Sequence, residues 1–254
     1  MTALPSGSYW GSPTASKRAL LIHGLTMASH TWEGIAQALA GAGYLVTAPN
    51  LPGHGYRQLT SDGDLRGQAL AKDLLSYFSG GTEYDCIIGH SLGAITAVAL
   101  LPFLPPTKRT SVILLDPPLE LSNDILTMIE DISLKAIHND NLIETLEAEN
   151  PLWTRQDIIG RAFAAKMCTS EVVQEICKQN DPWSFSSLLE TIPGHVFVTI
   201  LAADPKLSPS CPVESIPAHS QIQAIVVDGV DHWIPYVKPE LVVSTALSSV
   251  EKLL

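Results

Sequence analysis

The sequence predicts an α/β protein with a doubly wound, mostly parallel β-sheet and an inserted helical cap. Short apolar runs alternate with amphipathic stretches, which is the pattern of buried parallel strands joined by crossover helices. The alternation stops between Pro117 and about Asp181, where the pattern is helical and no strand is evident. A length of 254 residues suits one large domain of this kind and is short for two domains of ordinary size.

The expected strands are continuous apolar runs, as is typical of strands that are buried on both faces of a sheet. They span Ala19–Ile22, Tyr44–Ala48, Tyr84–Ile88, Val112–Leu115, Val196–Leu201 and Gln223–Val227. The stretches between them have apolar residues at helical spacing and are long enough to connect parallel strands. These expected helices span Trp32–Ala42, Leu65–Phe78, Leu92–Leu104 and Val237–Leu253.

The interruption divides the chain into a core and a cap. We expect residues 1–117 and 182–254 to form the core domain and residues 118–181 to form the helical cap. The apolar residues of the cap either line a substrate pocket or pack the cap onto the core, and the sequence leaves both roles open. The candidates for the pocket are Met128, Trp153, Phe163 and Met167.

Composition excludes several classes of partner. The net charge is -11 and the pI is near 5.0, whereas nucleic acids and anionic membranes attract clustered Lys and Arg. The first eighteen residues contain no apolar run of signal-peptide length, and no later run is long enough to span a membrane. We therefore expect a cytoplasmic protein that binds neither nucleic acid nor membrane. The oligomeric state is not predicted.

The cysteines and histidines do not suggest a metal site or a disulfide framework. The 4 cysteines are scattered without C-x-x-C spacing, and Cys86 lies inside an expected strand. The 8 histidines show no H-x-x-x-H or H-x-H pattern with nearby carboxylates. We expect the protein to work without a metal or another cofactor.

The most informative motif is Gly89-His90-Ser91-Leu92-Gly93, which joins an expected strand to an expected helix. This strand-turn-helix context is what a nucleophile elbow requires, although a chance match in a Gly- and Ser-containing turn is the alternative. Glycines two residues before and after the serine relieve the crowding at such a sharp turn. We expect the Ser91 hydroxyl to be exposed above the sheet.

A serine nucleophile needs a base, and the base needs a third group that fixes its tautomer. His232 follows the last expected strand and Asp204 follows the strand before it, so both reach the edge of the sheet from which Ser91 emerges. We predict Ser91 as nucleophile, His232 as general base and Asp204 as the orienting acid. Asp116 also ends a strand and remains an alternative acid. Asp204→Asn should then lower kcat on the order of 10⁴-fold, and a variant with near-normal turnover would move the role to Asp116.

These motifs resemble those of the α/β-hydrolase superfamily along essentially the whole chain. The order Ser, Asp, His matches that of the α/β-hydrolase elbow. Two further segments also match, namely His23-Gly24-Leu25 after the first strong strand and the loop of residues 49–55, Pro-Asn-Leu-Pro-Gly-His-Gly. The resemblance implies an α/β-hydrolase fold. It also implies an oxyanion hole formed by the backbone N–H groups of Leu25 and Leu92, the second of which begins a helix.

The chain departs from the family pattern in two places. Asn50 stands where many relatives have Asp, which concerns the structure of the loop. The strands that usually precede the His-Gly strand are reduced to a segment around Tyr9 and Trp10. His23, His54 and His90 are expected to be structural, and Trp233 either walls the substrate pocket or belongs to the core.

The predicted activity is hydrolysis of a small or medium carboxylic ester or lactone through an acyl-enzyme on Ser91. The predicted pocket residues are Trp153, Phe163, Met167 and Trp233. Two alternatives of the same fold remain open: a hydrolase of carbon–carbon bonds and a ligand receptor that retains the triad. A hydroxynitrile lyase is disfavoured, because such enzymes commonly have Lys after the histidine and this chain has Trp233.

Overall fold

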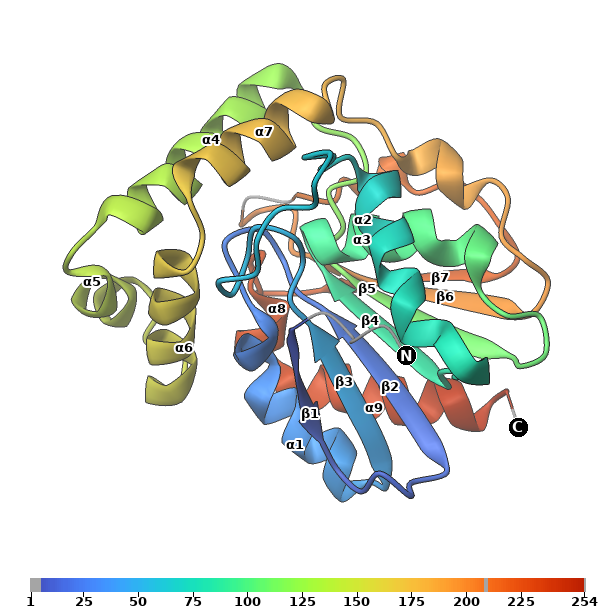
Figure 1. Cartoon of the computed structure of the whole chain (residues 1–254). Helices are drawn as coiled ribbons and strands as arrows, with labels where there is room; N and C mark the ends of the chain where they lie inside the picture. Colours follow the sequence, from blue (N-terminus) through green and yellow to red (C-terminus); the bar gives the residue numbers. More distant parts are fainter. Residues whose placement is uncertain (1–5, 208–209, 254) are drawn as a thin grey trace.

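A computed structural model describes residues 6–207 and 210–253 of the chain. Its centre is a 7-stranded sheet with the strand order β1-β3-β2-β4-β5-β6-β7. Only β1 is antiparallel to its neighbour among these strands, and every other pairing is parallel. Figure 1 shows the twisted sheet with helices on both faces and a separate group of helices beyond one edge. The predicted α/β-hydrolase fold, doubly wound and with a helical insertion, is confirmed.

Each expected strand is present, with small shifts at its ends. The strands are β1 (Gly7–Trp10), β2 (Lys17–Ile22), β3 (Tyr44–Pro49), β4 (Cys86–His90), β5 (Thr110–Leu115), β6 (Val196–Ala203) and β7 (Ile222–Val227). The segment around Tyr9 and Trp10 forms the edge strand β1, which pairs with β3.

Alternate residues of the strands point into two separate hydrophobic cores, as the pleat requires. Leu20 and Ile22 of β2 pack on the face covered by α2 (Gly67–Asp73) and α3 (Leu92–Leu100). Ala19 and Leu21 pack on the opposite face, under α1 (Glu33–Gly41) and α9 (Pro239–Glu251). Every residue of α3 is buried, so this helix, which begins directly after Ser91, is enclosed by the core.

Three expected helices differ from the prediction at their ends. The stretch expected at 65–78 is α2 followed by a 3-10 helix, Leu74–Gly81, that contains Gly80 at a positive φ of 68°. After Leu100 the chain continues as a short 3-10 turn, Leu101–Phe103, that contains Pro102. The last stretch begins as the short helix α8 (Ile234–Val237) and restarts at Pro239, where proline is well suited to the first turn of a helix.

The insertion between β5 and β6 consists of α4 (Asn123–His138), α5 (Leu142–Glu149), α6 (Arg155–Lys166) and α7 (Ser170–Gln179). Their starts are fixed locally, because Ser122, Thr154 and Thr169 each cap a helix with the side-chain oxygen. Figure 1 shows α4 and α7 side by side above the sheet, with α5 and α6 beside them. The predicted domain limits at residues 117/118 and 181/182 stay a prediction.

The carboxyl ends of β4, β5, β6 and β7 meet below the cap. His90 of β4 is level with Leu115 of β5, and Leu115 is level with Leu201 of β6. Ser91 and Asp116 therefore follow the paired last residues of two neighbouring strands, at the same position along the strand direction. β6 continues two residues farther, to Ala203, and carries Asp204 beyond that level. Within residues 6–207 and 210–253, no helix is long and apolar enough to cross a membrane.

Candidate active site

Ser91 occupies a strained turn between β4 and α3. Its backbone angles are φ 54° and ψ -121°, a conformation that L-residues rarely adopt. A Cβ on Gly89 would lie 2.4 Å from the Gly93 carbonyl oxygen, and one on Gly93 would lie 2.1 Å from the Ile22 carbonyl oxygen. Both glycines of the motif are thus required by close backbone contacts, which hold the serine at the tip of the turn.

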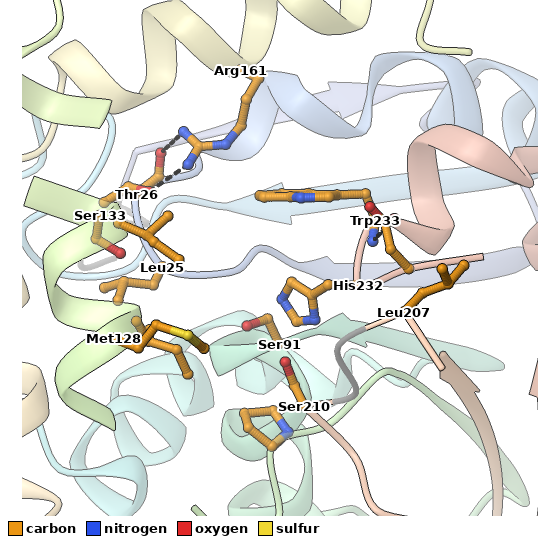
Figure 2. Close-up of a pocket in the computed structure, with 14 residues that line it drawn as sticks. Leu25, Thr26, Ser91, Met128, Ser133, Arg161, Leu207, Ser210, His232 and Trp233 are labelled. Carbon is orange, nitrogen blue, oxygen red and sulfur yellow. Dashed lines mark hydrogen bonds between the residues drawn. The ribbon is translucent and has the colours of Figure 1, made fainter. Parts of the chain in front are cut away.

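His232 lines the same pocket as Ser91, and its ring is held by a hydrogen bond to Asp116. Figure 2 shows the side chains of Ser91 and His232 in the same pocket, which both residues line. Nδ1 of His232 lies 2.6 Å from Oδ2 of Asp116. A carboxylate can only accept this bond, so Nδ1 carries the proton and Nε2 is left as the acceptor. The ring therefore has the tautomer that a base facing Ser91 requires.

Asp116 is fixed as an anion in the interior of the protein. It has no exposed surface, and its Oδ1 accepts a 2.9 Å hydrogen bond from the Ala203 backbone N–H. Burial alone would raise the pKa of this carboxyl, but the hydrogen bond and charge of His232 and the Ala203 N–H together lower it. Its backbone φ is 41°, so strain is found at this residue as well as at Ser91.

The predicted acid Asp204 does not contact His232, and the structure corrects this expectation. Its carboxylate accepts the backbone N–H of Gly229 at 2.8 Å and that of Lys206 at 2.9 Å. Both bonds lower the pKa of the Asp204 carboxyl. The physical reason is the extra length of β6, which carries Asp204 past the level of Ser91 and into the turn before His232.

His90 supports His232 from inside the core. Its Nε2 lies 3.0 Å from the His232 carbonyl oxygen, and the two rings lie 4.7 Å apart. Burial lowers the pKa of His90 to about 3, so the ring is neutral near pH 7 and donates from Nε2. This contact agrees with the structural role expected for His90. His23 accepts the Leu51 backbone N–H through Nε2 at 3.0 Å and so anchors the loop that contains Leu25.

Leu25 and Leu92 lie in the segments that follow β2 and β4. Leu92 is the first residue of α3, where backbone N–H groups have no partner within the helix and the helix dipole favours an anion. Leu25 lies in the loop after β2, followed by Thr26 at a positive φ of 55°, and it lines the same pocket as Ser91. The role of both N–H groups as oxyanion donors stays a prediction.

The catalytic pocket is a cavity of about 240 Å³ between the sheet edge and the cap. Met128, Ile129 and Ile132 of α4 form an apolar wall, and Trp233 and Leu207 lie on the core side. Met128 and Trp233 thus have pocket positions, as the sequence analysis allowed. The apolar part of the cap that lines this pocket comes from α4, whereas the predicted cap residues Trp153, Phe163 and Met167 lie farther along the chain.

The other predicted pocket residues lie elsewhere. Trp153 packs against Tyr236 and Trp233, with ring centroids 4.5 and 5.2 Å away, and lines a neighbouring cavity of about 880 Å³. Phe163 is 61% exposed and Met167 is half-buried, and neither lines the catalytic pocket. Phe163 lies on the exposed surface of α6 and Met167 directly follows that helix, so neither has the pocket position that was expected.

Arg161 was not identified from the sequence and is the most polar group in the cap wall. It projects from α6 into the pocket and donates to Thr26, from Nη1 to the carbonyl oxygen at 3.0 Å and from Nη2 to Oγ1 at 2.8 Å (Figure 2). Its guanidinium lies 5.2 Å from the centre of the Trp233 ring. One arginine in a helical stretch carries no sequence signal for a buried position, since such residues are mostly exposed.

No group of three or more His, Cys, Asp or Glu side chains in the described part of the chain is arranged to hold a metal ion. The groups gathered at this edge are a serine and a histidine whose ring is bonded to a buried carboxylate. Together with the sheet topology, this arrangement defines the class of α/β-hydrolases.

Comparison with known proteins leads to the same class. The model of the alpha/beta hydrolase family matches residues 19–245, and the chain belongs to this family. A curated relative, Esterase Rv0045c of Mycobacterium tuberculosis, is 31% identical over 99 residues. That match covers 38% of this chain and 31% of the relative, so it spans under a third of the relative's length.

Solved structures share the fold at low sequence identity. An E-2-(acetamidomethylene)succinate hydrolase is 18% identical with a TM-score of 0.79, over 96% of this chain and 93% of that one. An esterase from Exiguobacterium antarcticum is 16% identical with a TM-score of 0.74, over 96% of this chain and 94% of that one. At these identities the similarity establishes the fold.

Proposed function

We propose that the protein is a serine hydrolase that cleaves a small carboxylic ester, lactones included, through an acyl-enzyme on Ser91. The observation that carries the proposal is the hydrogen bond between His232 and the buried Asp116, behind a serine on a strained elbow. Strain of this kind at a single serine, with a base of the correct tautomer beside it, is typical of an activated nucleophile.

The proposed reaction uses each of these groups in turn. His232 Nε2 accepts the proton of Ser91 as Oγ attacks the ester carbonyl carbon, and the N–H groups of Leu25 and Leu92 stabilise the oxyanion that forms. The intermediate collapses, the C–O bond to the alcohol breaks, and the alcohol leaves with the proton held by His232. Water, deprotonated by His232, then attacks the acyl-enzyme and releases the acid and free Ser91.

The size and lining of the pocket support a small substrate. A cavity of about 240 Å³ with an apolar wall from α4 is below the usual volume of sites for drug-sized ligands. The partial match to a mycobacterial esterase and the fold shared with a bacterial esterase also favour ester chemistry. We further propose that the partner is this small molecule rather than nucleic acid or membrane, consistent with the net charge of -11.

The test is covalent labelling combined with turnover. Wild-type protein should react with a fluorophosphonate probe at Ser91 and hydrolyse short p-nitrophenyl esters, with activity falling as the acyl chain outgrows the pocket. Ser91→Ala should lose the label and most of the activity, on the order of 10⁶-fold in kcat. Ser210→Ala is the matched control for labelling, because Ser210 also lines the pocket but does not belong to the turn of residues 89–93. Labelling of Ser210 in place of Ser91 would contradict the proposal.

A further inference from the structure

Arg161 is a buried cation without a counter-ion. Its relative exposure is 6%, and no carboxylate among the described residues forms an ion pair or hydrogen bond with it. Burial lowers its pKa, yet a guanidinium remains protonated in proteins. A buried charge is costly unless it is paired, so this position needs an explanation.

Its known contacts leave hydrogen-bonding capacity unused. A guanidinium has five N–H donors, and Arg161 directs one from Nη1 and one from Nη2 to Thr26. Its Nε is buried and has no hydrogen-bond partner. The Trp233 ring offers its face to the cation, but a ring face does not neutralise a charge.

The charge faces the pocket that contains Ser91. Arg161 and Ser91 line the same cavity, with Trp233 contacting both the Arg161 guanidinium and, at 5.5 Å between centroids, the His232 ring. Asp231 also lines this cavity, but its Oδ1 accepts the Trp233 backbone N–H at 3.0 Å and it forms no ion pair with Arg161. An anion that enters the pocket would meet a guanidinium that no carboxylate among the described residues neutralises.

We propose that Arg161 binds a carboxylate of the substrate, so that the preferred substrates are monoesters of short dicarboxylic acids. This inference rests on the proposed function, since it names the substrate class of the same site. A carboxylate can accept two N–H bonds from the edge of the guanidinium that includes the unpaired Nε, and its single charge equals that of the one arginine. Arg161 also lines the neighbouring cavity of about 880 Å³, so the short chain is proposed from the cavity of about 240 Å³ that it shares with Ser91.

A purely structural role for Arg161 makes a different prediction. Its bonds to Thr26 also hold the loop that carries Leu25, so loss of Arg161 could disturb the proposed oxyanion hole. Damage of that kind would lower turnover of neutral and anionic esters alike. A carboxylate-binding role lowers turnover of anionic esters selectively, which makes the ratio of the two rates the decisive quantity.

The experiment measures kcat/KM for monomethyl succinate and monomethyl glutarate, each against the neutral ester in which a carboxamide replaces the carboxylate. Acid release is followed in a pH-stat. Wild type should prefer the anionic ester, and Arg161→Met should reduce this preference by about ten- to a hundredfold, as expected for loss of a hydrogen-bonded charge. Arg161→Lys should restore part of it. Arg155→Met is the matched control: it removes one positive charge from the same helix, at an exposed residue paired with Glu147, and should keep the wild-type ratio.

A measurement of ligand binding separates this inference from the proposed function. Thermal unfolding of the Ser91→Ala protein is measured with glutarate and with its neutral diamide. Only glutarate should raise Tm. Arg161→Met in the Ser91→Ala background should abolish this increase. If esters are not cleaved but glutarate binds through Arg161, the proposed function fails and the carboxylate site stands. Equal stabilisation by both ligands, or equal losses of neutral and anionic turnover in Arg161→Met, would overturn the carboxylate site.

Discussion

At the scale of single residues, Asp116 and Asp204 can be distinguished by amide substitution. Asp116→Asn should lower kcat on the order of 10⁴-fold, because an amide behind Nδ1 favours the wrong tautomer of His232. The structural basis is the 2.6 Å bond between Oδ2 of Asp116 and Nδ1 of His232. Steady-state kinetics on the preferred ester, with folding checked by circular dichroism, would measure the effect.

Asp204→Asn is the companion variant. An asparagine oxygen can still accept one of the N–H groups of Gly229 and Lys206, so we expect a loss of less than about tenfold in kcat. If Asp204→Asn were the more damaging of the two substitutions, the triad assignment from geometry would have to be abandoned.

The choice between these two aspartates shows what a sequence can and cannot resolve. Both follow a strand and both precede a proline, so order along the chain brings each to the correct edge of the sheet. Their heights at that edge depend on the register of β5 and β6 and on the two extra residues of β6, which only the paired sheet reveals. Ser91 and His232 were each predicted from a single loop, and both line one pocket in the structure, while their catalytic roles stay predictions.

At the scale of secondary-structure elements, the nucleophile elbow depends on the contact between α3 and β2. In Gly93→Ala the new Cβ would lie 2.1 Å from the Ile22 carbonyl oxygen. That oxygen belongs to the backbone of a buried strand and the Cβ is fixed to a buried helix, so neither atom can move aside easily. We expect a loss of stability of at least about 2 kcal/mol, because overpacking against backbone cannot be relieved by a rotamer change. Labelling of Ser91 by the probe should fall with it. Urea unfolding measures the first effect and gel fluorescence the second.

Gly34→Ala is the control for that substitution. Gly34 lies in α1, and an added Cβ there would meet no atom within 4 Å. Alanine in a helix is favoured over glycine, so stability should rise by up to about 1 kcal/mol with no change in labelling. If both substitutions had the same effect on stability, close contact at the elbow would not be the cause.

For the cap, the sequence predicted the helices but not which of their faces line the pocket. Its helical character was readable from the spacing of apolar residues and from turn residues such as Asn150 and Pro151. Which face points to Ser91 was not readable, because apolar residues occur on several faces. In the structure α4 provides Met128 and Ile132 to the pocket, while Phe163 of α6 is exposed.

At the scale of the whole molecule, the fold was predictable because the central parallel strands are buried on both faces, although the edge strand β7 is mostly exposed. Such strands appear in the sequence as unbroken apolar runs. Because crossovers between parallel strands are right-handed and short, the order of strands and helices along the chain is compatible with few sheet topologies. The cap orientation and the pocket chemistry depend on contacts between distant segments, such as Arg161 with Thr26, which no local pattern encodes.

The buried histidines predict how the stability of the whole molecule depends on pH. His23, His54 and His90 are fully buried, and burial lowers their pKa values, to about 4 for His54, to about 3 for His90 and well below the usual value for His23. In the unfolded chain each would titrate near about 6.5. Between these values the unfolded state binds more protons, so stability falls as pH falls.

The expected loss between about pH 7.5 and pH 5.5 is on the order of 1 kcal/mol for each histidine, or a few kcal/mol for the three together. Relief of self-repulsion acts in the other direction, because the chain carries a net charge of -11 that shrinks as the pH falls. A decrease in the free energy of unfolding over this range, measured in urea at several pH values, would therefore point to the buried rings. His54→Asn should remove about a third of the decrease, whereas substitution of the exposed His138 should leave it intact. A free energy of unfolding that stays level or rises toward pH 5.5 would show that these rings are not held neutral in the core.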